Sequence, residues 1–169
     1  FAPKERERLR RALFWQGFGV LGADCFVHPS ADLNAAYDAL VAEGLTDYLA
    51  RLMPLLAADA RSGLPANDAD LVARAWNLDA LAGAYGEFVA TYLPVLTEVR
   101  GDRLAEVADE DAFLLRTLLI HDYRRLLLRD PELPDVLLPV DWPGEKARRL
   151  CQELYRRLAP ASERHLDKF

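Results

Sequence analysis

Features that identify a membrane or secreted protein are scarce in this sequence of 169 residues. Its two cysteines, Cys25 and Cys151, are too few for a disulfide framework, which favours a reducing, cytoplasmic setting. No apolar run reaches the ~18 to 20 residues that a membrane-spanning helix needs. The first residues carry charge but not the apolar core of a signal peptide. We therefore expect a cytoplasmic protein with no membrane partner.

Motifs for catalysis and metal binding are also missing. The segment 17–22 (GFGVLG) lacks the glycine spacing of a dinucleotide-binding or phosphate-binding loop. The three histidines, His28, His121 and His165, lie far apart, and no HxxxH or CxxC pair accompanies them. No serine occupies a nucleophile elbow. We expect no metal, no resident cofactor and no catalytic residue, and hence a protein that is not an enzyme.

The charge balance limits the partners of these residues. The chain has 21 basic and 27 acidic residues, a net charge of −6. A protein face that binds nucleic-acid phosphates is basic, so a large DNA-binding surface is not expected here. Because the chain begins at Phe1, we expect it to be a fragment of a longer protein whose upstream part carries some of the function.

The first third of the sequence predicts alternating helical and extended pieces. Residues 3–16 have the pattern of a helix that ends at Gly17, and residues 17–29 form short extended pieces. A second helix is predicted over residues 30–44, with Ser30 as its N-cap and a glycine past its end. The leucines of residues 45–56 have helical spacing, but a strand at about 50–57 would complete a sheet, and we favour the strand.

The remainder of the chain is predicted to be helical. A segment rich in small residues at 61–70 indicates a boundary, and helices are expected at about 78–96, 109–128 and 144–158. The fold class is therefore α+β. The predicted domains are a small α+β unit over residues 1–62, a mainly helical C-terminal subdomain over residues 66–160, and a tail over residues 161–169.

The connector between the last two predicted helices is apolar and rich in proline. Neither a helix nor a central strand can run through the three prolines of residues 133–144. We expect Val136, Leu138 and Trp142 to be buried against neighbouring helices, which would hold the connector in place.

The helix at 109–128 carries the most informative polar residues. At ~100° per residue, Arg116 and Arg124 fall within a wide apolar arc that also contains Tyr123, whereas His121 lies on the opposite side. A buried arginine needs an anionic or carbonyl partner. That partner is either an internal carboxylate such as Asp79 or Glu87, or the phosphate or carboxylate of a bound ligand.

Several segments together resemble one protein family. Residues 121–158, with their Asp-Trp-Pro-Gly segment, resemble the C-terminal signature of the PaaX family, repressors of phenylacetic acid degradation operons. Residues 71–88 resemble the start of the same region. Residues 6–33 are similar to the family's middle domain, which is ferredoxin-like and related to the CRISPR protein Cas2, so the resemblance implies that residues 1–62 form a partial ferredoxin-like (Cas2-like) subdomain. The resemblance covers nearly the whole chain, but the family's N-terminal winged-helix domain is not found in it.

The resemblance implies a function in transcription regulation. It implies a homodimer that binds operator DNA through the N-terminal domain and releases it on binding an aryl-CoA effector, typically phenylacetyl-CoA, in phenylacetate catabolism. The candidate ligand-binding residues rest on the helix pattern and on nearby aromatic residues: Arg116, Arg124, Tyr123, His121, Trp76 and Trp142. The alternatives are a purely structural dimerisation domain, an enzyme acting on a CoA thioester and, by analogy with Cas2, a nuclease.

Overall fold

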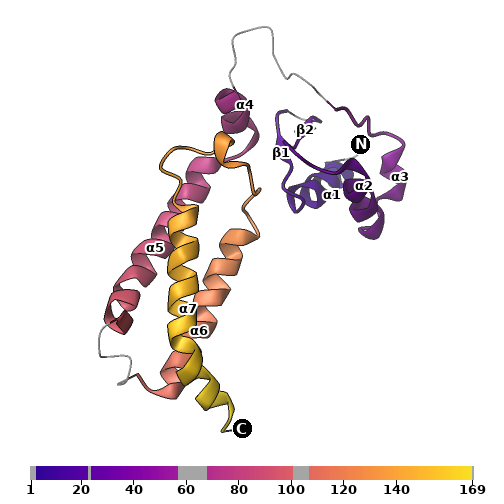
Figure 1. Ribbon diagram of the computed structural model, residues 1–169. Helices are drawn as coiled ribbons and strands as arrows, with labels where there is room; N and C mark the ends of the chain where they lie inside the picture. The colour runs from indigo at the N-terminus through magenta and orange to yellow at the C-terminus, as the bar shows by residue number, and fades with distance from the viewer. Residues whose placement is uncertain (1–2, 23, 57–67, 101–106, 169) are drawn as a thin grey trace. The chain divides into compact units, whose positions relative to one another are not determined.

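The chain folds into two compact units, one of helices with a small β-sheet and one of helices (Figure 1). The computed structural model describes residues 3–22, 24–56, 68–100 and 107–168. The first unit comprises residues 1–77 together with 129–138, and the second comprises residues 78–128 together with 139–169. The division therefore lies beyond the boundary predicted at 61–70, and part of the proline-rich connector belongs to the first unit.

The first unit begins with a helix and short extended pieces, as predicted, and the extended pieces pair as a β-hairpin. Helix α1 (Pro3–Phe14) is followed by Gly17, whose φ of +83° turns the chain in a region that favours glycine. Strands β1 (Gly19–Val20) and β2 (Phe26–Val27) pair antiparallel. The register joins Gly19 to Val27 and Val20 to Phe26. The buried core of this part comes from α1 and the helix and turn that follow the hairpin: Leu9, Ala12, Leu13, Leu40 and Leu45.

Helix α2 (Leu33–Ala42) begins at a different cap from the one predicted. The Asp32 carboxylate accepts hydrogen bonds from the second and third backbone N–H groups after it, at 2.8 and 3.4 Å. Ser30, the predicted cap, instead donates its backbone N–H to Nδ1 of His28 at 3.1 Å. The predicted glycine past the end is confirmed, because Gly44 has a φ of +71°.

The strand predicted at about 50–57 is wrong for the residues that the structure describes. The short helix α3 (Thr46–Leu49) uses the helical spacing of the leucines, and residues 50–56 contain no strand. Pro54 removes one ladder donor, and the described part of the first unit has only a two-stranded sheet of two residues per strand. Residue 57 lies outside the described residues. The α+β class is confirmed, and the ferredoxin-like arrangement stays a prediction.

Helix α4 (Asp68–Ala75) packs against β1 and against the 3-10 turn η2 (Asp135–Leu137). The indole N–H of Trp76 donates to the carbonyl of Gly17 at 3.0 Å. A Cβ added at Gly19 would lie only 2.7–2.8 Å from atoms of Trp76 and of the last residue of α4. Glycine at this position therefore permits the close approach of α4 to the hairpin.

The connector is only partly buried, and not at all of the predicted positions. Val136 is 87% exposed, whereas Leu133, which we did not single out, is 5% exposed. Leu138 and Trp142 are half-buried. The prediction for Val136 is wrong because η2 turns the chain at this residue, so the side chains on either side of it do not share one face.

The second unit is a bundle of three helices that run in alternating directions (Figure 1). They are α5 (Leu78–Arg100), α6 (Asp109–Leu127) and α7 (Gly144–Leu166). Helix α7 contacts both of the others, and its buried residues recur at helical spacing: Ala147, Leu150, Cys151, Leu154 and Leu158. Within the described segments, no helix combines the length and the apolar character needed to cross a bilayer.

Helix α7 continues beyond its predicted end at residue 158, so most of the predicted tail at 161–169 is helical. Pro160 lies inside the helix, where it removes one backbone hydrogen bond. Ala161 and Ser162 are nevertheless buried, at 5% and 1% exposure. Packing of these two residues opposes the cost of the proline and keeps the last turns helical.

Candidate functional site

Arg116, a predicted ligand-binding residue, is held by side chains of α7. Its side chain is 18% exposed, and its guanidinium carbon lies 4.1 Å from the centre of the Tyr155 ring. It donates hydrogen bonds to the Tyr155 hydroxyl and, at 3.3 Å, to Oγ of Ser162. The carboxylate of Glu163 lies 3.8 Å away. This arrangement supports the interpretation that Arg116 has an internal partner, although the partners are Tyr155, Ser162 and Glu163 and not the predicted Asp79 or Glu87.

Arg124 is exposed, contrary to the buried position that the apolar arc of α6 predicted. The arc is wider than the surface that α6 buries. The buried residues are Ala112, Leu119 and Leu126. His121 is also exposed, and Tyr123 is half-buried, with its ring 5.5 Å from that of Phe88. The predicted set on α6 therefore points in several directions.

A tyrosine–aspartate pair joins α5 to α6 next to His121. The hydroxyl of Tyr92 donates to Oδ2 of Asp122 at 2.8 Å. Burial, and then the hydrogen bond to this carboxylate, raise the pKa of Tyr92 above its ordinary value. Asp122 is thus engaged with α5, and the geometry shows a structural link between two helices.

The two candidate tryptophans lie in different units. Trp76 belongs to the first unit, and Trp142 belongs to the second, where its ring meets that of Tyr85 edge-on at 5.8 Å. Trp142 precedes α7, whereas Tyr155, which holds Arg116, lies about 17 Å along the axis from the start of α7 at 1.5 Å per residue. Within the second unit, Arg116 and Trp142 therefore do not line one compact slot.

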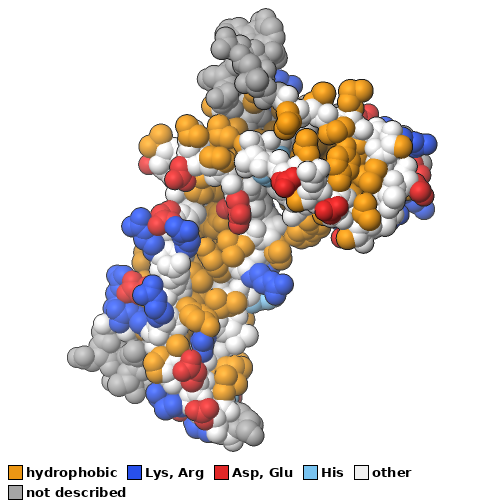
Figure 2. All heavy atoms as spheres, turned by 45° about the vertical axis from the view of Figure 1, so that its right-hand side comes forward, with side chains coloured by type: hydrophobic (Ala, Val, Ile, Leu, Met, Phe, Trp, Pro, Cys, Tyr) orange, Lys and Arg blue, Asp and Glu red, His pale blue; other side chains and the backbone are white. Residues whose placement is uncertain are grey.

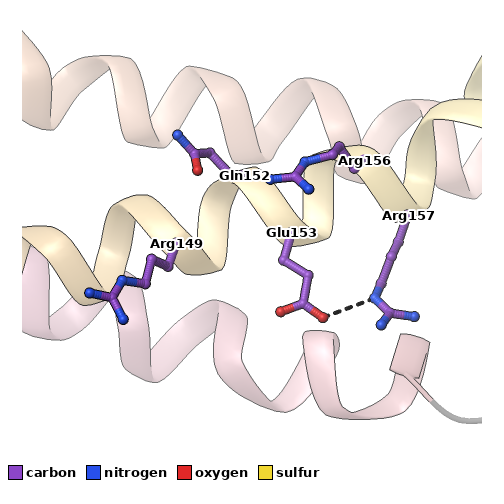
Figure 3. Close-up of a pocket in the computed structure, with 5 residues that line it drawn as sticks. All are labelled: Arg149, Gln152, Glu153, Arg156 and Arg157. Atoms are coloured by element: carbon purple, nitrogen blue, oxygen red, sulfur yellow. Dashed lines mark hydrogen bonds and ion pairs between the residues drawn. The ribbon is translucent and has the colours of Figure 1, made fainter.

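A basic groove runs along α7 and reaches α5. It was not among the predicted sites. One hollow of about 540 Å³ is lined by five residues of α7: Arg149, Gln152, Glu153, Arg156 and Arg157 (Figure 3). A second hollow of about 370 Å³ shares Arg149 and Glu153 and reaches α5. It adds basic, acidic and apolar residues: Leu93, Leu96, Arg100, Glu145, Lys146 and Leu150.

Two carboxylates organise the arginines of this groove. Glu153 accepts from Nε of Arg100 at 2.9 Å and from Nε of Arg157 at 3.1 Å. Glu145 contacts Arg148 at 2.8 Å and Arg149 at 2.7 Å. The hydrogen bonds from Arg100, and then from Arg157, lower the pKa of Glu153 to about 2. Both carboxylates are therefore ionised at neutral pH, because Arg149 lowers the pKa of Glu145 as well.

The sequence contains a signal for this groove. Lys146, Arg149 and Arg156 follow one another along α7 at intervals of three and seven residues, which places them on one side of the helix. Glu153 falls on the same side, four residues after Arg149. The sequence does not predict that Arg100 lines the groove, because this depends on where the end of α5 packs.

The structure offers little for catalysis or metal binding. Among the residues it describes, no group of three or more histidine, cysteine or acidic side chains could hold a metal ion. Burial raises the pKa of the Cys151 thiol to about 11, and the Ser162 hydroxyl accepts from Arg116. Both side chains are therefore used in packing and hydrogen bonding within the bundle.

Comparison with known proteins identifies the family. The family model described as PaaX-like protein C-terminal domain matches residues 76–168, more than half of the chain. The chain belongs to the PaaX family. It is 34% identical over 157 residues to the transcriptional repressor PaaX of Escherichia coli (strain K12), which covers 91% of this chain and 48% of the repressor. A solved structure, the uncharacterized protein Rv0674 from Mycobacterium tuberculosis, has a TM-score of 0.57 at 25% identity, covering 94% of this chain and 55% of that one.

The PaaX match covers the three-helix bundle and the basic groove. It begins at Trp76 and extends to the end of α7, so the resemblance inferred from residues 121–158 is confirmed. The relative from E. coli is named a transcriptional repressor. The chain spans about half the length of these relatives.

Proposed function

We propose that this chain is the effector-binding and dimerising part of a cytoplasmic, one-component transcriptional repressor of aromatic acid catabolism. The observation that carries the proposal is the 34% identity to a transcriptional repressor over 157 residues. Operator DNA would be bound by an N-terminal winged-helix domain that these residues do not include. The net charge of −6 supports the assignment of DNA binding to another domain, because DNA-binding surfaces are basic.

The proposed effector is an aryl-CoA thioester such as phenylacetyl-CoA. Such a ligand is anionic at one end and apolar at the other, so its site needs basic groups close to apolar surface. The groove along α7 combines both, because Arg149 lines it together with Leu93, Leu96 and Leu150. Arg116 has its own partners on α7 and is a weaker candidate for contact with the ligand.

The proposed macromolecular partner is a second copy of this chain. Helix α6 and the residue after it expose an apolar face at 40–57% of each side chain: Leu114, Leu118, Ile120, Leu127 and Leu128. Figure 2 shows apolar side chains gathered along the helical part of the chain. A helix face of this kind pairs with itself about a twofold axis, which suits a repressor that reads two half-sites. Replacing Leu118 with glutamate should shift the sedimentation coefficient from dimer to monomer, whereas Thr91→Glu, which adds the same charge at an exposed position on α5, serves as a comparison.

The effector proposal is tested by titrating phenylacetyl-CoA into the 169-residue chain while heat and tryptophan fluorescence are measured. We expect saturable binding that phenylacetate alone does not reproduce. Trp76→Phe and Trp142→Phe variants will show which tryptophan reports the binding. Absence of heat and of any fluorescence change with a folded, dimeric chain would contradict effector binding by these residues.

A purely structural dimerisation domain is the second candidate. It is favoured by Arg116, which is held within the bundle by Tyr155 and Ser162, and by Trp76, whose indole N–H is bound to Gly17. In that case the chain would dimerise and bind no acyl-CoA. The titration and the sedimentation measurements together separate the two candidates.

A further inference from the structure

The basic groove of α7 has more positive charge than its own carboxylates balance. Its lining contains five basic residues, Arg100, Lys146, Arg149, Arg156 and Arg157, and two acidic ones, Glu145 and Glu153. The chain as a whole has a net charge of −6, so this local excess opposes the overall balance. Figure 2 shows Lys and Arg side chains gathered along one edge of the helical part of the chain.

Each carboxylate holds two arginines, and each such triad keeps one net positive charge. Glu153 binds Arg100 and Arg157, and Glu145 binds Arg148 and Arg149, which follow it by one helical turn. A guanidinium has five N–H donors, and these contacts use one or two of them. The arginines are thus held in position by a carboxylate while further donors remain for an anion.

Two more cations strengthen the groove. Lys146 and Arg156 line it, and neither forms an ion pair with another residue that the structure describes. Figure 3 shows Arg156 extending along α7 over Gln152, away from the Glu153–Arg157 pair. An exposed, uncompensated cation beside a prearranged triad is a suitable contact for a phosphate oxygen.

The two triads are separated along the helix. Their carboxylates belong to Glu145 and Glu153, eight residues apart, which corresponds to roughly 12 Å along the axis of α7. A phosphate bound at one triad leaves the other triad available, and a ligand with phosphates at two separate places can contact both. Leu93, Leu96 and Leu150 provide apolar surface beside the first triad.

We propose that this groove binds the phosphorylated end of a nucleotide that carries a diphosphate and a second, separate phosphate ester. The 3′-phospho-ADP portion of coenzyme A has this chemistry. For CoA thioesters the proposal rests on the proposed function, and the groove would bind the nucleotide portion of the effector rather than its aryl group. The site would recognise the phosphates, and the acyl chain would extend beyond them.

The test uses the 169-residue chain, coenzyme A without an acyl group, adenosine 3′,5′-bisphosphate and phenylacetyl-CoA, each titrated at low and at high salt. The groove variant combines Arg149→Gln with Arg156→Gln. The control variant combines Arg11→Gln with Arg125→Gln, which removes the same charge from exposed positions outside the groove. Circular dichroism verifies that both remain folded. We expect the groove variant to bind coenzyme A at least tenfold more weakly than the control variant, with a smaller dependence on salt.

The outcomes separate this proposal from the proposed function. Equal affinity of the two variants for phenylacetyl-CoA would contradict the groove as the binding site, but it would not contradict effector binding by this chain. Tight, groove-dependent binding of coenzyme A with no gain from the phenylacetyl group would support the groove and contradict sensing of an aryl thioester. If the parent chain binds none of these ligands, both are overturned. If a short DNA duplex binds in place of coenzyme A, and only the groove variant loses it, the groove is a nucleic-acid surface and the proposal is wrong.

Discussion

Replacing Arg116 with alanine removes the side chain that joins α6 to the C-terminal part of α7. The change deletes hydrogen bonds to Tyr155 and Ser162 and the contact of the cation with the Tyr155 ring. It also leaves the hydroxyl of Ser162, a residue only 1% exposed, without this partner. A hydrogen bond from a charged donor contributes about 1.5–3 kcal/mol, and a cation–ring contact about 0.5–2 kcal/mol.

These contributions are coupled and therefore do not add. The bond to Ser162 is also long, at 3.3 Å. We expect the free energy of unfolding to fall by about 2–4 kcal/mol, the range for breaking a well-connected polar cluster. Since a domain of 60–100 residues loses roughly 4–8 °C per kcal/mol, the melting temperature should drop by about 10 °C or more. Urea unfolding and thermal melts followed by circular dichroism measure both quantities.

Arg124→Ala is the matched control, because Arg124 lies on the same helix and is exposed. It should change the free energy of unfolding by no more than about 0.5 kcal/mol. Arg116→Lys keeps the charge but not the planar fork of donors, so it should lie between the parent and the alanine variant. If Arg116→Ala is as stable as Arg124→Ala, the polar cluster at the end of α7 does not hold the bundle together and the reasoning is refuted.

Three further predictions follow from local geometry. Gly19→Ala should destabilise the first unit in urea unfolding, because its Cβ would lie 2.7–2.8 Å from its neighbours, whereas Gly22→Ala, with no neighbour within 4 Å, should not. The low pKa of Glu153, about 2, means that its ion pairs stabilise the fold above the unfolded-state pKa of ~4.3 and that this contribution is lost as pH falls towards 2. The difference in melting temperature between the parent and Glu153→Gln should therefore be full at pH 6 and shrink between about pH 4 and 2; a constant difference would contradict the assignment. Cys25 is exposed and Cys151 is buried with a pKa of about 11, so a thiol reagent at pH 8 should modify Cys25 rapidly and Cys151 only after denaturation.

The sequence predicted helix ends correctly where a glycine or a proline has a strong backbone preference. Gly17 and Gly44 end helices at positive φ, and a proline begins α1, as expected from their backbone preferences. The start of α2 was less predictable, because Ser30 and Asp32 are both good N-caps. The choice between them depends on His28, whose ring nitrogen accepts the backbone N–H of Ser30.

Features that depend on tertiary packing were not predictable from the pattern. The apolar arc of α6 includes both Arg116 and Arg124, but only part of that arc faces another helix, so one arginine is held and the other is exposed. The helix predicted over 144–158 ends too early, because α7 continues to Leu166 and the buried Ser162 within this extension is where Arg116 binds. The groove was missed for the same reason, since Arg100 is distant from Glu153 in sequence and meets it only in the folded bundle.

The course of the chain suggests how a change in the bundle would reach the rest of the protein. The chain passes between the two units three times, and residues 129–138 belong to the first unit although they connect α6 to α7 of the second. Leu133 is buried, and Pro131, Pro134 and Pro139 restrict the backbone on either side of it. A displacement of α7 relative to α6 would therefore act on a stiff segment and would not be absorbed by a flexible loop. A ligand produces such a displacement only if it binds one arrangement of the helices better than another. The groove is formed by two helices, because Arg100 comes from α5 and the other cations come from α7, so a ligand bound there would act on the position of α7 relative to α5.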